Sequence, residues 1–327
     1  MKRKQILLIG NGINLNFGCG NWDMLLMSLS GLDKAKYEKY KSPMPLKAIA
    51  TIGVNVRDRL FNLKKKEYKK YQENLLSPIS NEELEYLRSL LSLGFDQILT
   101  TNYTYELECA ALNERVVSES KLKRLQKVTK NHDVKKAESK YLLHTYNQIE
   151  NGEKPYNIWH IHGEARKPFS LILGHYEYGN LLFKIKEFLN KRGNSYYDKQ
   201  KQGETIKYKS WIDYFIMSDV YVLGFGFDFS ELDLWWLLNR RKNENAKTGK
   251  VYYYSPKSAK DFDEKQILLK QFDVEICDCG VTLPKIGKDE SKEDYSLRCR
   301  AYYKEFYNNA IVEINTQKEK NEDEKDN

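Results

Sequence analysis

Short runs of β-branched and aliphatic residues alternate along the chain with longer segments whose apolar residues recur at helical spacing. The runs predict strands at 5–9, 95–100, 157–162, 171–173, 220–223, 251–254 and 274–277. The longer segments predict helices at 22–29, about 46–76, 81–93, 105–112, 181–191, 230–241 and 259–271. Several strands are almost continuously apolar, as strands buried on both faces are. The pattern predicts a doubly wound, Rossmann-like α/β fold with a mostly parallel sheet.

These elements make residues 1–280 one domain, into which helical insertions are predicted at about 31–92, 113–150 and 176–215. Within them, 114–140 is rich in Lys, Arg and Glu, which predicts a solvated helix or helical hairpin, and 190–209 predicts a polar loop. Residues 281–316 predict a C-terminal helical segment. Residues 317–327 are almost entirely polar and charged, which predicts a disordered tail.

Composition limits the partners of such a domain. Lys and Arg outnumber Asp and Glu by 54 to 46 among 327 residues, and the resulting formal charge of +8 is spread along segments of mixed sign. This balance suits an anionic small molecule and gives little reason to expect a nucleic-acid partner. No segment has the apolar length of a membrane span, and five irregularly spaced cysteines make no disulfide framework. We therefore expect a cytoplasmic protein without a membrane partner.

A glycine-containing turn follows the first predicted strand, with Gly10, Asn11, Gly12 and Asn14 in it. Glycines at such a turn let the backbone approach a pyrophosphate, with N–H groups pointing at the anion. The full G-x-G-x-x-G spacing is absent because position 15 is Leu. A structural tight turn explains the same residues, although the first strand–helix crossover is where doubly wound folds bind nucleotides.

The strand at 95–100 ends in a small polar cluster that includes Thr101, Asn102, Tyr103 and Thr104. An Asn at this edge of the sheet can hydrogen-bond a ribose hydroxyl or an attacking water. Alternatively, Thr101, Asn102 or Thr104 caps the helix that begins near 105.

The strand at 157–162 carries His160 and His162, which alternation places on the same face of the sheet. His162 stands at the strand end, where an imidazole can act as a general base near neutral pH. The alternative is one core and one exposed histidine, and for a metal site only Glu164 is close in sequence.

A second glycine-containing loop, with Gly224 and Gly226, follows the strand at 220–223 and precedes Ser230, Glu231 and Asp233. A Ser N-cap with acidic residues in the first helical turn explains this pattern. A second nucleotide-facing loop would have the same composition.

Taken in order, these stretches resemble the bacterial sirtuin-like superfamily of phage-defence NADases, including the AbiH-type abortive infection proteins. The resemblance spans most of 1–280 and is carried by 10–14 with Trp22, 100–104 with Glu108, 161–163, and 223–226 with Asp233. It departs at Thr104, where many members have Asp. This chain then uses another carboxylate or lies nearer the AbiH branch.

The resemblance implies an NAD glycohydrolase, in which NAD is the substrate and not a cofactor. Asn102 would orient the nicotinamide ribose or the attacking water, and His162 would be the base that activates this water. The other expected contacts with the dinucleotide are Gly10, Asn11 and Gly12 on the pyrophosphate, Asn14, Thr101 and Tyr103 beside them, and Gly224 and Asp233 near the adenosine half.

Sirtuin deacylases also hold zinc with two close cysteine pairs, whereas only Cys277 and Cys279 are close in this chain. We therefore expect no zinc and no other metal. One alternative to an enzyme is a non-catalytic nucleotide-binding sensor, which Thr104 in place of Asp supports. Another is a nucleic-acid-binding or structural subunit of a defence complex, for which 114–140 is the candidate surface.

Because unrestrained NAD hydrolysis poisons the producing cell, we expect a latent enzyme that self-assembly or a protein partner activates. Candidate surfaces are 114–140 and the segment that contains Tyr302, Tyr303, Phe306 and Tyr307. Packing of these aromatic side chains on the domain's own core is the alternative.

Overall fold

The computed structural model describes residues 3–17, 27, 33–41, 78–129, 140–152, 154–193, 195–256, 261–282, 284–285, 287 and 290–326. The helix predicted at 46–76 lies outside these residues, as does all of the helix predicted at 22–29 except Met27. Trp22 and Cys19 lie outside them too.

The described residues form one eight-stranded sheet in the order β3-β4-β5-β2-β1-β6-β7-β8. Its six parallel strands are β5 (Tyr156–His160), β2 (Gln97–Thr100), β1 (Gln5–Ile9), β6 (Asp219–Leu223), β7 (Val251–Tyr254) and β8 (Val274–Cys277). The antiparallel strands β3 (Gln126–Val128) and β4 (Thr145–Ile149) extend one edge. The predicted doubly wound, mostly parallel α/β fold is confirmed.

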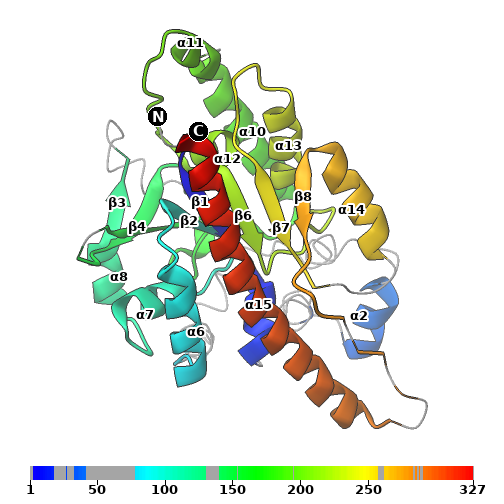
Figure 1. Cartoon of the computed structure of the whole chain (residues 1–327). Coiled ribbons are helices and arrows are strands. Elements are labelled where there is room, and N and C mark those ends of the chain that lie inside the picture. The colour runs from blue at the N-terminus through cyan, green and yellow to red at the C-terminus, as the bar shows by residue number, and fades with distance from the viewer. Residues whose placement is uncertain are drawn as a thin grey trace.

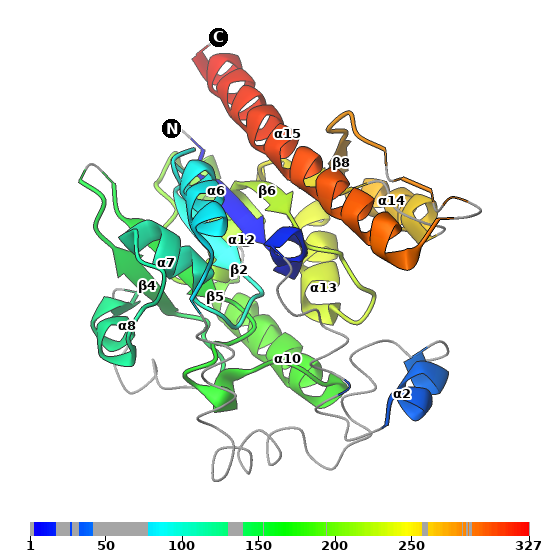
Figure 2. The ribbon, with the colours of Figure 1, turned by 90° about the horizontal axis from the view of Figure 1, so that it is seen from below.

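Strand alternation gives the sheet two apolar faces, each covered by helices (Figures 1 and 2). Ile6 and Leu8 face the layer that contains α10 (His175–Arg192), α12 (Trp211–Met217), α13 (Leu232–Lys242) and α14 (Asp261–Gln271). Leu7 and Ile9 face the layer of α6 (Asn81–Leu91), α7 (Glu106–Leu112) and α15 (Lys292–Asp326). The remaining helices are η1 (Asn11–Phe17), α2 (Lys34–Lys41), α8 (Glu119–Leu125), η2 (Pro168–Ser170) and α11 (Ser195–Lys201).

The segment predicted as a disordered tail is instead part of α15, which continues to Asp326. Its polar side chains pair with tyrosine hydroxyls of the sheet: Asn321 Nδ2 donates to Tyr221 Oη at 2.8 Å, and Tyr252 Oη donates to Asn321 Oδ1 at 2.8 Å. The composition of 317–327 gave the wrong prediction because burial here depends on specific hydrogen bonds and not on apolar surface.

The aromatic side chains of α15 pack on the domain's own core. Tyr302, Phe306 and Tyr307 are buried in the cluster beneath the helix, and Tyr303 is partly buried against it. The alternative given for these residues is therefore confirmed, and they do not form an exposed surface for a partner.

Three local predictions were wrong. Residues 171–173 form no strand, although all three side chains are buried in an irregular segment after η2. The insertion at 113–150 contains the strands β3 and β4 as well as α8, because its alternating polar residues pair at the sheet edge. The segment 190–209, expected as a loop, contains α11.

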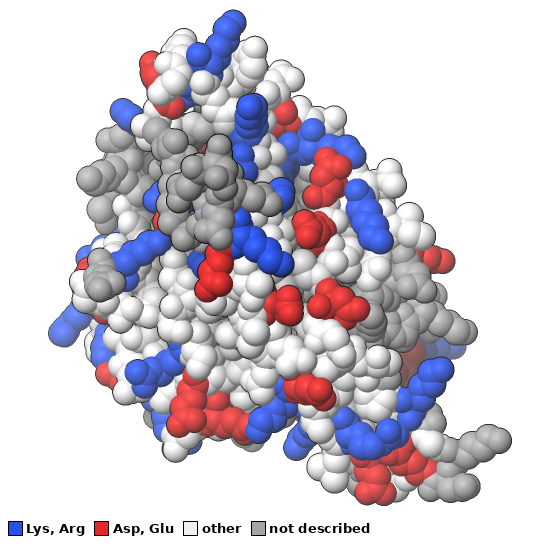
Figure 3. Space-filling view, in the orientation of Figure 1, with Lys and Arg blue, Asp and Glu red and all other residues white. Residues whose placement is uncertain are grey.

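The order of the strands creates a switch point beside β1, which pairs with β2 on one side and with β6 on the other. Open α/β sheets bind ligands outside the carboxyl ends of the strands at such a point. On the face seen in Figure 3, Lys and Arg lie interspersed with Asp and Glu. Among the described helices, none has the length and apolar character to span a membrane.

Candidate functional site

The loops after β1 and β6 pack directly on each other at the switch point. Gly10 N donates to Leu223 O at 3.0 Å, and Gly12 N donates to Gly224 O at 2.7 Å. A Cβ at either Gly10 or Gly12 would come within 2.6 Å of Gly224 O. The tight-turn interpretation explains both glycines, and these two N–H groups already have partners other than a phosphate.

Asparagine side chains from the segments after β1 and β2 meet the carboxylate of Glu106. Asn14 Nδ2 donates to Asn11 Oδ1 at 2.9 Å and to Glu106 Oε1 at 3.1 Å, and Asn102 Nδ2 donates to the same Glu106 oxygen at 2.6 Å. Within the described residues, neither Asn14 Oδ1 nor Asn102 Oδ1 has a hydrogen-bond partner, and both atoms are buried. Buried unsatisfied oxygens are rare, so their presence at this edge marks a place where a ligand can supply donors.

The Asn102 loop is fixed to its neighbours by its backbone. Thr101 N donates to Ile9 O at 3.2 Å, and Asn102 N donates to Thr100 Oγ1 at 3.0 Å. The N-cap of α7 is Tyr105, and no side chain caps the helix there. The capping interpretation of Thr101, Asn102 and Thr104 is therefore wrong, which leaves the Asn102 side chain available for a ligand.

His160 braces this loop from β5. Its Nδ1 donates to Asn102 O at 2.9 Å and its Nε2 to Glu108 Oε1 at 2.9 Å, while Asn147 Nδ2 donates to the same Glu108 oxygen at 2.8 Å. Burial alone would lower the pKa of His160, but the Glu108 carboxylate outweighs it and raises the pKa to about 9. His160 is thus a buried cation with a structural role.

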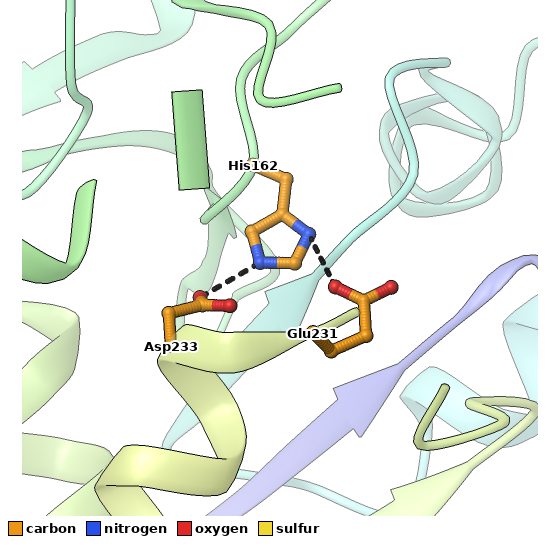
Figure 4. A group of neighbouring side chains, drawn as sticks. All are labelled: His162, Glu231 and Asp233. Atoms are coloured by element: carbon orange, nitrogen blue, oxygen red, sulfur yellow. Dashed lines mark hydrogen bonds and ion pairs between the residues drawn. The ribbon is translucent and has the colours of Figure 1, made fainter. Parts of the chain in front are cut away.

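His162 lies between two carboxylates from the start of α13 (Figure 4). Its Nε2 donates to Asp233 Oδ2 at 2.9 Å. On the opposite side of the ring, Nδ1 lies 3.6 Å from Glu231 Oε2 and 3.5 Å from Tyr178 Oη, and that hydroxyl donates to Glu231 Oε2 at 2.7 Å. Asp233 fixes the ring and its tautomer, so that Nδ1 of a neutral imidazole carries the lone pair.

Hydrogen bonds connect the Asn102 loop to the His162 loop. Thr100 pairs with His160 across β2 and β5, so Asn102 and His162 each stand two residues beyond one register pair. Tyr103 O accepts from Ala165 N at 2.8 Å, and Tyr103 Oη donates to Ile172 O at 2.6 Å. Asn102 and His162 therefore lie at the same edge of the sheet, and Tyr103 has a bracing role between their loops.

His162, Glu231 and Asp233 also form, within the described residues, a group compact enough to hold a metal ion. The two carboxylates, however, lie beside opposite nitrogens of the imidazole. A metal bound at one ring nitrogen would meet only one of them in the ring plane, so the arrangement fits a hydrogen-bonded triad better than a metal centre. Cys109, Cys277, Cys279 and Cys299 are free thiols.

The site thus contains both expected catalytic residues, but it groups the others differently. Gly10, Asn11, Gly12, Asn14, Thr101 and Gly224 surround the switch point with Asn102. Asp233, expected near the adenosine half, bonds His162 instead. Ser230 does not cap α13 but donates to Asp228.

Sequence reasoning missed three residues of the site, which are Glu106, Glu231 and Tyr178. Glu106 begins α7 and accepts from Asn14, a residue 92 positions earlier, and no spacing in the sequence indicates that contact. In the sequence, Glu231 is explained as an acidic residue at the start of a helix, which gives no sign of its contact with His162. Nothing in the sequence links Tyr178 to His162.

No protein-family model matches this chain, and no curated protein matches it significantly. The assignment of a function therefore depends on the side chains described above and on the resemblance in the sequence motifs.

Proposed function

We propose that the chain is a sirtuin-like NAD glycohydrolase that cleaves NAD to nicotinamide and ADP-ribose. The observation that carries this proposal is the placement of Asn102 and His162 two residues beyond the paired Thr100 and His160. This brings a buried amide with an unpartnered oxygen and a carboxylate-held imidazole to one edge of the sheet, at the strand ends where doubly wound folds bind nucleotides.

In the proposed reaction, water attacks the ribose carbon as the glycosidic bond breaks. Nicotinamide leaves as a neutral molecule, so positioning and electrostatics supply most of the acceleration. Asn102 Oδ1 accepts a hydrogen bond from a ribose hydroxyl or from the attacking water. His162 Nδ1 takes the proton of that water, which typically contributes about 10²–10⁴-fold to the rate.

Asp233 supports this assignment of the base. A carboxylate on Nε2 keeps the proton on that nitrogen and stabilises the imidazolium that forms after proton transfer. Glu231 and Tyr178 lie on the Nδ1 side, where they can take part in the hydrogen bonding of the water.

The experiment that tests the proposal is incubation of the purified protein with NAD and chromatographic detection of nicotinamide and ADP-ribose. We expect both products in equal amounts. Binding of NAD without any product, under all conditions that also change the state of assembly, would favour the alternative of a nucleotide-binding sensor, for which Thr104 in place of Asp speaks.

The proposal includes a cellular role as an antiphage abortive-infection effector in the cytoplasm, held inactive until self-assembly or a protein partner activates it. With the aromatic side chains of α15 buried, the charged insertion 114–140 remains as the candidate surface, although 130–139 lie outside the described residues. We expect turnover per molecule to rise with protein concentration together with the mass measured by light scattering. Constant turnover in a stable monomer would contradict this part of the proposal.

A further inference from the structure

Glu106 joins the first loop of the chain to the Asn102 loop, and the reaction described above gives it no role. Its Oε1 accepts from both Asn14 Nδ2 and Asn102 Nδ2. The three side chains belong to residues that are only 3–6% exposed: Asn102 3%, Glu106 5% and Asn14 6%. Within the described ranges, no Lys, Arg or His forms an ion pair with Glu106. Among these residues, its partners are the two amides alone.

The two amides turn their nitrogens toward this carboxylate, and it is their oxygens that have no partner among the described residues. A hydrogen bond from an amide N–H to a carboxylate polarises the amide and increases the negative charge on its oxygen. One carboxylate and two polarised amide oxygens thus form a cluster that consists of acceptors. Such a cluster is complementary to positive charge and repels phosphate.

The neighbouring Glu108, which the sequence motif indicates, has a different environment. Its carboxylate is paired with the His160 cation and bonded to Asn147. The charge of Glu108 is thereby neutralised inside the protein, whereas Glu106 has no cationic partner in the part of the chain that the structure describes. Of the two carboxylates on α7, Glu106 is the one that can act on a substrate. It can take over the role of the Asp that many members of the superfamily resembled by this chain have where this chain has Thr104.

Building on the proposed function, we propose that Glu106 makes the site selective for the oxidised, cationic nicotinamide ring and stabilises the positive charge that passes to the ribose as the ring leaves. The bond between ribose C1′ and the ring nitrogen breaks, and its electron pair neutralises the pyridinium. The positive charge then lies on C1′ and the ribose ring oxygen until water adds at C1′ and His162 takes the water's proton. Glu106 acts on this charge through Asn14 and Asn102, so it is a positioning residue.

The experiment compares the binding of two dinucleotides that are not cleaved, by calorimetry. One is carba-NAD, in which a methylene group replaces the oxygen of the nicotinamide ribose ring and the nicotinamide remains cationic. The other is NADH, whose ring is neutral. We expect the wild type to prefer carba-NAD, and Glu106→Gln to reduce that preference at least about tenfold. Glu106→Asp, which keeps the charge, should retain most of it.

Glu108→Gln is the matched control on the same helix. It should lower the melting temperature, because it removes the partner of His160, and it should leave the ratio of the two dissociation constants unchanged. If Glu106→Gln does not fold, Asn14→Ser provides a second test, because it removes one polarised amide and should reduce the preference several-fold. An unchanged ratio in the folded Glu106→Gln or Asn14→Ser protein would overturn the proposal.

Turnover separates this proposal from the proposed function. If the wild type cleaves no NAD but its preference for the cationic ring is lost in Glu106→Gln, the glycohydrolase assignment fails and the charge selectivity stands. If the wild type cleaves NAD and Glu106→Gln has the same kcat, the role of Glu106 in the reaction is wrong and the assignment stands. Absence of binding for both dinucleotides overturns both.

Discussion

His160 holds the backbone of Asn102, with His160 Nδ1 2.9 Å from the Asn102 carbonyl oxygen. The other ring nitrogen, Nε2, lies 2.9 Å from Glu108 Oε1. A carbonyl and a carboxylate both accept, so both nitrogens carry protons and the ring is a cation. The two histidines of β5 and its following loop therefore divide their roles: His160 fixes the position of the candidate catalytic Asn102, and His162 is the candidate base.

This arrangement predicts a pH-dependent stability. The pKa of His160 in the folded protein is about 9, above the ordinary histidine value of 6.5. Its contribution to the free energy of unfolding is fully present below about pH 6.5 and is lost as the pH rises through about 9. We expect this contribution to be about 3 kcal/mol. Urea unfolding at pH 6, 7.5 and 9.5 should show the loss in the wild type and little of it in His160→Ala, which should be less stable at pH 6. Parallel pH profiles for the two proteins would contradict the prediction.

We predict that Asn102→Ala and His162→Ala each abolish NAD cleavage and leave unfolding cooperative. Asn102 would lose the oxygen that orients ribose or water, and His162 the atom that takes the proton. Release of nicotinamide is the measurement, with thermal unfolding beside it. His175→Ala is the control, because His175 is exposed at the start of α10. Near-native turnover in either variant would exclude the catalytic role of that residue.

Asp233→Asn should lower kcat about 10²–10⁴-fold with little change in KM. An Asn amide can donate to His162 Nε2, which places the ring proton on Nδ1 and removes the lone pair from the candidate reacting nitrogen. The pH dependence of kcat should shift as well. Asp228→Asn serves as the control, since Asp228 bonds Ser230 in the same loop and not His162. Equal losses in the two variants would point to a general effect on the loop.

Activity should be insensitive to chelators, and metal analysis should find neither zinc nor another divalent ion at parity with the chain. The first reason is that Glu231 and Asp233 flank opposite nitrogens of His162. The second is that Cys277 and Cys279 are the only two cysteines close together in the sequence, so a second close pair for zinc is missing. Stoichiometric metal that is lost in Asp233→Asn would identify His162, Glu231 and Asp233 as its ligands and would overturn the role of His162 as a base.

Asn321→Ala should destabilise the protein by about 1–3 kcal/mol, because it leaves the buried hydroxyls of Tyr221 and Tyr252 without this partner. Asn315→Ala, at an exposed position of the same helix, should cost less than about 0.5 kcal/mol. Urea unfolding measures both. Equal stability of the two variants would mean that the end of α15 does not contribute to the fold.

The parallel strands could be predicted because burial on both faces leaves runs such as 5–9 and 220–223 almost purely apolar. The edge strands β3 and β4 could not, since Gln126, Lys127, Asn147 and Gln148 give them a polar composition. In the site, Asn102 and His162 were predictable from their places at strand ends. The roles of Asp233 and Glu106 could not be predicted, because they depend on contacts that sequence spacing does not encode. The hydrogen bond between His162 and Asp233, for example, joins residues 71 positions apart.

The contact of Gly12 with both Gly224 and Tyr307 also bears on the order in which the chain is made. A Cβ at Gly12 would lie 2.6 Å from the Gly224 oxygen and 2.9 Å from the Tyr307 hydroxyl, so two distant parts of the sequence close around this loop. The loop with Asn11 and Asn14 is synthesised well before its neighbours from β6 and α15. A nascent chain that does not yet include Gly224 and Tyr307 lacks the residues that surround the first loop. We therefore expect an unfinished copy of the proposed enzyme to carry an incomplete site and to leave NAD intact.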